Sequence, residues 1–456
     1  MMGGRLRDPR VIVAAAMGLG LAVRLGRVAE WPLLHPDGPA YVSLTRAMLR
    51  GEWTAVLGGY YSPLYPMATA PLVATGVPAE LAARLVATFA GVLVLPLVFR
   101  LARAVGGDTV AAVTVVLAAV HPALVKASSQ VLPETLAGLF VMASGLVLFR
   151  GDGAWRASLA GVFAGLAYLA RPEAVLLVPI GATWLAWRRR PTMFAAFVVA
   201  TAIVMAPAVL ALHAQRGTWK VSPREGMIAR HAGLSGETSL PTAVLHHPGA
   251  VLGLWARGVG EQGWDTLVAL GPILALPFVI GVWTLPPGWP LVVAAAFVVG
   301  PLALNPSPRY AVPVLPLLLP WAGAGLIALA PRSGRRAGAG LAVVAMILIG
   351  QALWKGKPFD EACSREVRDL LVSRYGRGQT LVAVDGRFAY VAEGTPVVPK
   401  TTAPKAALDL ARARNAHLWL TRPQWLGKGF TPPDGVREVA RPCRGVFVLF
   451  EVDTSP

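Results

Sequence analysis

The feature that most constrains this chain is a series of apolar segments, each near the ~20 residues that an α-helix needs to cross a bilayer. Of its 456 residues, 55% are hydrophobic and 14% are charged, whereas soluble domains carry about 25% charged residues. Backbone groups in lipid must find hydrogen-bond partners inside their own segment, so such segments form helices. The sequence therefore predicts a polytopic α-helical membrane protein of the inner or plasma membrane.

The net charge of +18 is carried by small basic clusters that separate the apolar segments. A nucleic-acid-binding surface would instead gather its basic residues into one patch or stripe, so we expect no nucleic-acid partner. Cytoplasmic loops are enriched in Lys and Arg. The arginines before the segment 11–29 therefore predict an uncleaved first span, a cytoplasmic N-terminus and an outer loop at 30–65.

The basic clusters also decide whether the short, proline-broken segment 64–78 crosses the membrane. If it does not cross, the arginine-rich turns between later segments all lie in the cytoplasm. If it crosses, they all lie outside, against the charge rule. We therefore expect 64–78 to be re-entrant or interfacial, which leaves about eleven spans. They lie near 11–29, 81–100, 109–126, 131–149, 157–170, 172–187, 192–213, 264–284, 290–304, 310–330 and 338–354.

The composition changes after residue 355, where charged residues become frequent. Short β-type patterns at 381–385, 417–420 and 445–450 and a helical pattern at 405–414 follow. They predict a transmembrane domain at 1–355 and a small α/β domain at 356–456, which the topology places outside the cell. There Cys363 and Cys443, the two cysteines of the chain, either form a disulfide or remain thiols. No metal-binding spacing of Cys or His occurs, so we expect neither metal nor cofactor.

The predicted topology brings polar stretches from distant parts of the sequence to the outer membrane face. Ionisable residues at a membrane are candidates for function. Sugar transfer from a phosphate carrier needs a base for the attacking hydroxyl and cations for the departing phosphate. Asp37 is the candidate base, and Glu134 is a second acid to orient the acceptor or hold Arg171. The candidate binding residues are Arg171, Glu173, Arg309, Tyr310, Tyr61, Lys126 and His35.

Each candidate also has a structural interpretation, which the sequence leaves open. Asp37 would cap the following helix or form a turn, and Glu134 would interact with the dipole of the helix that it begins. The placement of so many charges on one face favours the functional interpretation. The other structural roles are an ion pair of Arg171 with Glu173, snorkelling of Lys126, interfacial anchoring by Arg309 and a structural His35.

These residues resemble the GT-C superfamily of membrane glycosyltransferases, over about residues 10–330. The most similar branch contains protein O-mannosyltransferases and lipid A aminoarabinose transferases. Two positions depart from it: Gly38 stands where a second acid is frequent, and Ser62 stands where aminoarabinose transferases have lysine. The matching residues are Arg24-Leu25, Asp37, Tyr41, Ala47, Leu49-Arg50-Gly51, Tyr61-Ser62-Pro63-Leu64-Tyr65-Pro66, Ala83-Arg84-Leu85, His121-Pro122, Glu134-Thr135, Leu169-Ala170-Arg171-Pro172-Glu173, Arg309-Tyr310, Pro313 and Pro316.

The resemblance implies a polyprenyl-monophosphate sugar donor, inversion at the anomeric carbon and extracytoplasmic catalysis that requires no nucleotide. It assigns Asp37 as the catalytic aspartate and Glu134 as the acid of the second outer loop. The acceptor would be a hydroxyl of a protein, glycan or lipid. The alternative is a non-enzymatic or degenerate protein that binds or flips a polyprenyl-phosphate-linked sugar. A flippase would carry ionisable residues along a path through the bilayer, and the predicted mid-span regions carry almost none.

Overall fold

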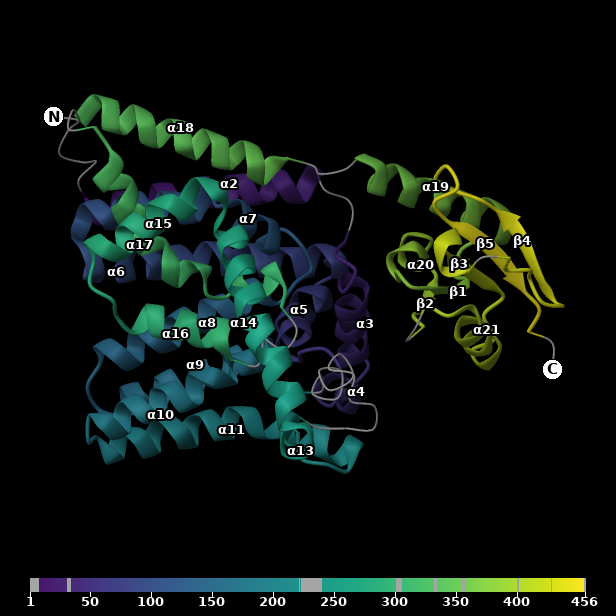
Figure 1. The fold of residues 1–456 in the computed structure, drawn as a ribbon, viewed down its shortest axis with the longest axis horizontal. Helices are drawn as coiled ribbons and strands as arrows, with labels where there is room; N and C mark the ends of the chain where they lie inside the picture. Colours follow the sequence, from purple (N-terminus) through teal and green to yellow (C-terminus); the bar gives the residue numbers. More distant parts are fainter. Residues whose placement is uncertain are drawn as a thin grey trace. The chain divides into compact units, whose positions relative to one another are not determined.

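The chain forms two compact units in the computed structural model, drawn in Figure 1. The first is built from residues 1–30 and 41–354, and the second from residues 31–40 and 355–456. The predicted boundary after residue 355 stays a prediction. The structure describes residues 8–30, 34–220, 222, 240–300, 306–331, 334–354, 358–399, 402–427 and 429–454.

The first unit begins with helices around the predicted outer loop. The element α6 has two helical parts that meet at Gly107 and match the predicted segments 81–100 and 109–126, although the second part ends earlier, at Val120. The backbone of α6 leaves the helical conformation at Gly107, whose φ of 81° is unstrained for glycine but strained for other residues. The helices in chain order are α2 (Pro9–Glu30), α3 (Gly38–Leu49), α4 (Trp53–Leu57), α5 (Leu64–Ala74), α6 (Ala79–Val120) and α7 (Pro122–Ser128).

The next helices pack closely because small residues line their contacts. A Cβ atom at Gly161 on α9 would overlap the main-chain oxygen of Phe197 on α11, and Ala164 and Ala167 of α9 are fully buried. Small residues let helix backbones approach one another in lipid. The elements are α8 (Glu134–Arg150), α9 (Ala154–Ala170), η1 (Pro172–Leu176), α10 (Leu177–Trp187) and α11 (Pro191–Arg216).

The last part of the first unit contains a broken helix. The helices α14 and α15 meet at an angle of 108°, and Gly271 at the break has a φ of 87°. Helix α15 crosses α17 so closely that a Cβ atom at Gly281 would overlap the main chain of Trp321. The elements are α13 (Leu240–His246), α14 (Pro248–Leu270), α15 (Pro272–Thr284), α16 (Trp289–Val299), η3 (Pro308–Ala311), α17 (Leu315–Leu329) and α18 (Gly334–Leu353).

The helices confirm the predicted helical class. Among the described residues, four helices (α2, α6, α11 and α18) are long and apolar enough to cross a membrane, and α14 with α15 would form a fifth, broken span. Shorter apolar helices of 10–17 residues occupy several other predicted positions. A bilayer core needs about 20 helical residues, so the count of eleven crossings stays a prediction. The arginines before residue 8 and the end of the predicted span 290–304 lie outside the described residues.

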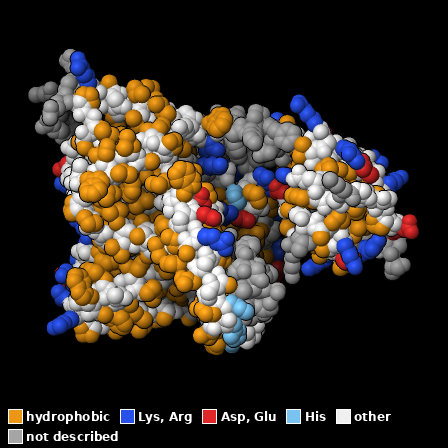
Figure 2. All heavy atoms as spheres, viewed as in Figure 1, with side chains coloured by type: hydrophobic (Ala, Val, Ile, Leu, Met, Phe, Trp, Pro, Cys, Tyr) orange, Lys and Arg blue, Asp and Glu red, His pale blue; other side chains and the backbone are white. Residues whose placement is uncertain are grey.

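The surface of the first unit carries many large apolar side chains. Trp283, Leu245 and Ile203 are 87%, 77% and 67% exposed, and Figure 2 shows hydrophobic atoms over most of the visible face of these helices. Soluble monomers rarely expose apolar patches of more than a few hundred Å². Such a surface is suited to contact with lipid chains.

The second unit is an α/β domain with a five-stranded sheet of order β2-β1-β3-β5-β4. Strand β1 is parallel to β2 and β3, whereas β5 is antiparallel to β3 and β4. The sequence patterns indicated β1, β3, β5 and α21, but missed the short β2 and the largely exposed β4. The elements are α19 (Pro358–Tyr375), β1 (Thr380–Ala383), α20 (Arg387–Val391), β2 (Thr395–Val397), α21 (Pro404–Ala413), β3 (Leu418–Thr421), η4 (Pro423–Trp425), β4 (Val436–Ala440) and β5 (Val448–Val452).

Two side-chain links fasten α19 to this sheet. The buried residues Cys363 and Cys443 form a disulfide, which settles the alternative that the sequence left open. The carboxylate of Glu451 accepts hydrogen bonds from the Tyr375 hydroxyl at 2.5 Å and from Arg437 at 2.6 Å. These hydrogen bonds, that of Tyr375 foremost, hold the pKa of Glu451 below its usual value. Partial burial and the same bond raise the pKa of Tyr375 to about 12.

Candidate functional site

A cluster of ionised side chains lies inside the first unit, with Glu134 at its centre. The Glu134 carboxylate is fully buried. It accepts a hydrogen bond from Arg171 at 2.5 Å and another from Nε of Arg309 at 2.9 Å. The three residues come from the start of α8, the junction of α9 with η1, and η3. The fold thus joins three predicted outer turns in one ion cluster.

Prolines shape the backbone that presents these side chains. Arg171 precedes Pro172, and a residue before proline is disfavoured in the helical conformation. Arg171 is accordingly extended, with φ −151° and ψ 120°, and turns away from the end of α9. Glu134 follows Pro133 as the first residue of α8, where a carboxylate interacts favourably with the helix dipole. The helix-dipole role that the sequence left open for Glu134 therefore coexists with its place in the cluster.

The Arg171 guanidinium is enclosed by acceptors. Its NH1 donates to Glu134, while its Nε and NH2 each donate to Glu173 at 3.2 Å. The guanidinium carbon lies 4.9 Å from the centroid of the Tyr310 ring, within range of a cation–π interaction. The Arg171 side chain is only 4% exposed. The charge of Arg171 is thus paired with two carboxylates of the protein, those of Glu134 and Glu173.

Arg309 differs from Arg171 in its exposure. Its side chain is 26% exposed, and its NH2 group lies 2.8 Å from Glu134. A buried amide fixes the backbone just before it: Gln262 of α14 accepts a hydrogen bond from the Ser307 main-chain N–H at 3.0 Å and donates one to its carbonyl. Glu134 and the fixed backbone therefore hold Arg309 in place, while its side chain stays partly exposed. Gln262 carried no signal in the sequence, because it is a single uncharged polar residue among the charged residues Arg257, Glu261 and Asp265.

Four tyrosines form a row of edge-to-face ring contacts beside the cluster. Tyr60 contacts Tyr61, Tyr61 contacts Tyr41, and Tyr41 contacts Tyr65, with ring centroids 5.1–5.3 Å apart. Tyr60 is 40% exposed, whereas Tyr41 and Tyr65 are buried. Tyr41 also lies near enough to Arg171 for an electrostatic interaction. Tyr61, a predicted binding residue, is thus one member of an aromatic row that leads from the surface toward the ion cluster.

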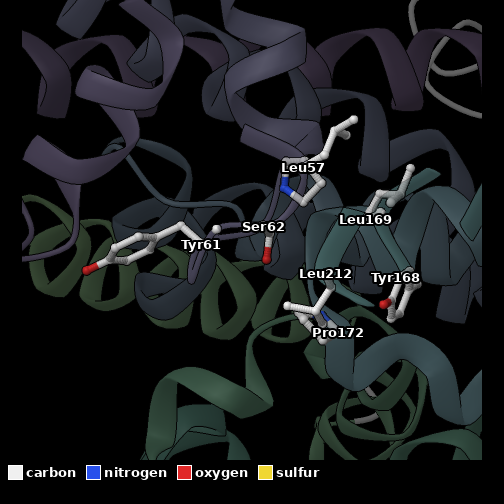
Figure 3. A pocket seen from close by; sticks show the side chains of 10 residues that line it. Leu57, Tyr61, Ser62, Tyr168, Leu169, Pro172 and Leu212 are labelled. Atoms are coloured by element: carbon white, nitrogen blue, oxygen red, sulfur yellow. The ribbon is translucent and has the colours of Figure 1, made fainter. Parts of the chain in front are cut away.

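A small cavity, drawn in Figure 3, is lined in part by Tyr61 of this row. Its volume of about 20 Å³ holds a water molecule but no sugar. Ser62, which is 4% exposed, directs its hydroxyl into the cavity, while the Tyr61 ring points away from it. The cavity is lined by Leu57, Gly59, Tyr61, Ser62, Pro63, Tyr168, Leu169, Pro172, Ala208 and Leu212.

Asp37 and His35 belong to the second unit and form a local pair there. His35 Nδ1 lies 3.7 Å from the Asp37 carboxylate, and the Asp37 main-chain N–H donates to the same nitrogen at 3.2 Å. Both side chains are about a quarter exposed, at 24% for Asp37 and 26% for His35. Asp37 directly precedes α3, which is the position of a helix cap.

Lys126 lies in a different environment from Glu134. It is on α7 and interacts electrostatically with Arg27 of α2. Arg27 donates to the main-chain oxygens of Ala352 and Trp354 at the end of α18. Arg24, one turn earlier, donates to neutral oxygens, including Ser128 Oγ at 2.8 Å. The structure thus groups Lys126 with helix-packing arginines.

Arg84 enters the sequence analysis only as part of the motif Ala83-Arg84-Leu85. Arg84 is 3% exposed, and its NH2 group lies 2.8 Å from Glu80, one turn before it on α6. The spacing of the two residues along a helix would have predicted this pair. Within the described ranges, no group of three or more His, Cys, Asp or Glu side chains is arranged to hold a metal ion.

Comparison with known proteins adds family and fold information. Residues 64–213 match the family model described as dolichyl-phosphate-mannose-protein mannosyltransferase. No curated protein matches this chain.

Solved structures match nearly the whole chain. ArnT from Cupriavidus metallidurans, in a crystal structure with bound undecaprenyl phosphate, is 15% identical with a TM-score of 0.58, covering 96% of this chain and 97% of that chain. The archaeal oligosaccharyltransferase AglB from Archaeoglobus fulgidus, in complex with an inhibitory peptide and a dolichol-phosphate, is 13% identical with a TM-score of 0.53. That match covers 90% of this chain and 69% of that chain. The shared fold and the family match together confirm the resemblance to the GT-C superfamily of membrane glycosyltransferases.

Proposed function

We propose that this protein is an inverting glycosyltransferase that moves a sugar from a polyprenyl-monophosphate carrier to a hydroxyl of an extracytoplasmic protein, glycan or lipid. The observation that carries the proposal is the buried Glu134 carboxylate, which holds Arg171 and Arg309 together inside a GT-C fold. Two proteins of that fold have a polyprenyl phosphate or a dolichol-phosphate in their structures. A lipid carrier with a phosphate group is thus the class of ligand that a fixed arginine here would bind.

Arg309 is the proposed phosphate ligand. Its guanidinium is 26% exposed, guanidinium groups bind phosphate oxygens by charge-assisted hydrogen bonds, and Glu134 fixes its orientation. Arg171 has all three of its nitrogens on carboxylates, so we assign it a positioning role through Glu134 and Tyr310. Tyr61 and Tyr310 are the proposed contacts for the carrier head group. Fixed donors stabilise the charge that develops on a leaving phosphate without reorganisation.

Asp37 is the proposed general base, in a turn where its main-chain N–H donates to His35 Nδ1. The acceptor hydroxyl oxygen attacks the anomeric carbon, and Asp37 takes the hydroxyl proton. The bond from the anomeric carbon to the phosphate oxygen breaks, and the polyprenyl phosphate leaves with the electron pair. A single displacement of this kind inverts the anomeric carbon. The glycosidic oxygen of the product comes from the acceptor.

The proposal places the active site and the second unit on the extracytoplasmic side. The basic turns between apolar segments support this orientation. The disulfide between Cys363 and Cys443 also supports it, since disulfides form and persist mainly in oxidising compartments. In a cell, a membrane-impermeant maleimide after reduction would label these cysteines from the outside only.

The decisive experiment measures sugar transfer by the purified full-length protein in lipid nanodiscs. Labelled polyprenyl-phosphate hexoses, pentoses and aminopentoses serve as donors, with a total membrane extract as the source of acceptors. We expect Asp37→Asn to abolish turnover and Arg309→Gln to raise KM for the donor roughly tenfold or more, since a hydrogen bond to a charged group contributes about 1.5–3 kcal/mol. Asp369→Asn, which removes a carboxylate that is 66% exposed, is the matched control.

Two results would contradict the proposal. Wild-type turnover by Asp37→Asn would remove the base from the mechanism. Carrier binding by the wild-type protein without turnover of any donor would favour the alternative of a binding or flipping protein.

A further inference from the structure

The turn that carries Asp37 is held by the second unit. Residues 31–40 form one compact unit with residues 355–456. Inside this unit, the guanidinium of Arg387 lies between the Asp385 carboxylate and the main-chain carbonyl oxygen of Leu34. Leu34 precedes Asp37 by less than one helical turn of sequence. A residue far along the chain thus contacts the backbone of the candidate catalytic turn.

Asp385 fixes the direction of the Arg387 side chain. The two residues lie just after strand β1, where α20 begins. The Asp385 carboxylate accepts the Arg387 main-chain N–H at 3.0 Å, Nε at 2.9 Å and NH2 at 2.5 Å. Such a two-pronged pair is among the strong hydrogen-bond geometries of proteins. The remaining NH1 group donates to the Leu34 oxygen at 3.5 Å.

The turn itself is compact, so a contact that fixes the Leu34 backbone also restricts the position of Asp37. The Gly38 main-chain N–H donates to the His35 oxygen at 2.7 Å, and the Asp37 N–H donates to the His35 ring. The Leu34 side chain is 5% exposed and covers Gly38 closely. A Cβ atom at residue 38 would lie 3.0 Å from Leu34 Cβ. This contact also gives a physical reason for Gly38 where related proteins often have a second acid.

We propose that Arg387, oriented by Asp385, is a positioning residue for the transfer reaction: it fixes the turn that presents Asp37. The inference rests on the proposed function, since it assigns a role only if Asp37 is the base. Arg387 contacts no substrate in this scheme, so its loss changes kcat and leaves KM for the donor near its wild-type value. A displacement of about 1 Å at a reacting group costs up to roughly 100-fold in rate. We expect Arg387→Ala to lower kcat about 10- to 100-fold.

The test compares kcat, donor KM and hydrogen exchange of the 34–40 peptide in the full-length protein. Arg387→Ala should lower kcat and speed exchange of this peptide. Arg387→Lys should give an intermediate kcat, because an ammonium is a point charge that cannot reproduce the planar fork of guanidinium donors. The matched control is Arg441→Ala, which removes another arginine of the same unit, bonded to Glu438 at 2.7 and 3.0 Å. The control should leave kcat and the peptide's exchange unchanged.

The outcomes separate this inference from the proposed function. If Asp37→Asn is inactive while Arg387→Ala keeps wild-type kcat and exchange, the positioning role is overturned and the base assignment stands. If Asp37→Asn is fully active, the proposed function fails first. If Arg387→Ala and Arg441→Ala lower kcat equally, or Arg387→Ala raises donor KM alone, the positioning role is also overturned. Should Arg387→Ala unfold the second unit, the intermediate kcat and exchange of Arg387→Lys decide: wild-type values would overturn the role.

Discussion

Replacement of Glu134 by glutamine tests whether its charge holds the ion cluster together. The side chain is fully buried between Arg171 and Arg309, and glutamine keeps its size while removing the negative charge. Breaking a buried ion pair by removing one partner costs about 3–5 kcal/mol. Arg171 keeps its bonds to Glu173 and Arg309 is partly solvated, so we expect the lower end, about 3 kcal/mol less unfolding free energy.

The coupling energy between Glu134 and Arg309 tests their interaction more directly than the stability of either single variant. Arg309→Gln alone leaves Glu134 paired with Arg171 and should cost about 1 kcal/mol, since its cation is 26% exposed. In the double variant of Glu134→Gln with Arg309→Gln, the Arg309 cation that Glu134 would have neutralised is also absent. Its cost should therefore be about 1–2 kcal/mol smaller than the sum of the two single costs, as contacting residues in one network couple.

The assay is denaturant unfolding in one fixed detergent, with donor KM measured on the same samples. Glu134→Gln should also raise donor KM about tenfold, because a misdirected Arg309 loses about 1.4 kcal/mol of phosphate binding. Wild-type stability together with wild-type KM would refute the reasoning. Additive single costs in the double variant would show that the two residues do not act as a unit.

Three further outcomes follow from particular contacts. Gly281→Ala should destabilise the protein by about 1–3 kcal/mol in thermal unfolding, because its methyl group meets the main chain of α17, whereas Gly18→Ala, with open space around it, should not. Replacing Cys363 and Cys443 by serine should lower the unfolding free energy of the second unit by about 4–5 kcal/mol for a loop of this length, measured by chemical denaturation; an unchanged midpoint would contradict this. The lowered pKa of Glu451 stabilises the fold above its unfolded-state pKa, about 4.3, and this contribution is lost as pH falls through the lowered value. Glu451→Gln should therefore flatten the acid side of the stability–pH curve, and an unchanged slope would exclude the contribution.

The positions of the helices could be predicted from the sequence because the transfer of each apolar segment into lipid is favourable by itself. The segment 172–187, for example, matches η1 with α10 (Pro172–Trp187), and 192–213 matches α11. The two helical parts of α6 match the predicted segments 81–100 and 109–126, because the non-helical Gly107 separates them. The strand β4 was missed because Arg437 and Glu438 face water, which leaves a weak apolar pattern.

The sequence by itself determined the membrane class, the change to an α/β domain and the set of charged residues worth considering, because composition and local periodicity act within each segment. Only the tertiary structure decided which of those charges meet. Glu134 contacts Arg171 across 37 positions and Arg309 across 175, while Lys126, much closer in sequence, is grouped with Arg27. The physical reason is that an ion pair depends on distance in space, and no local pattern records which distant helix ends the packing will bring together.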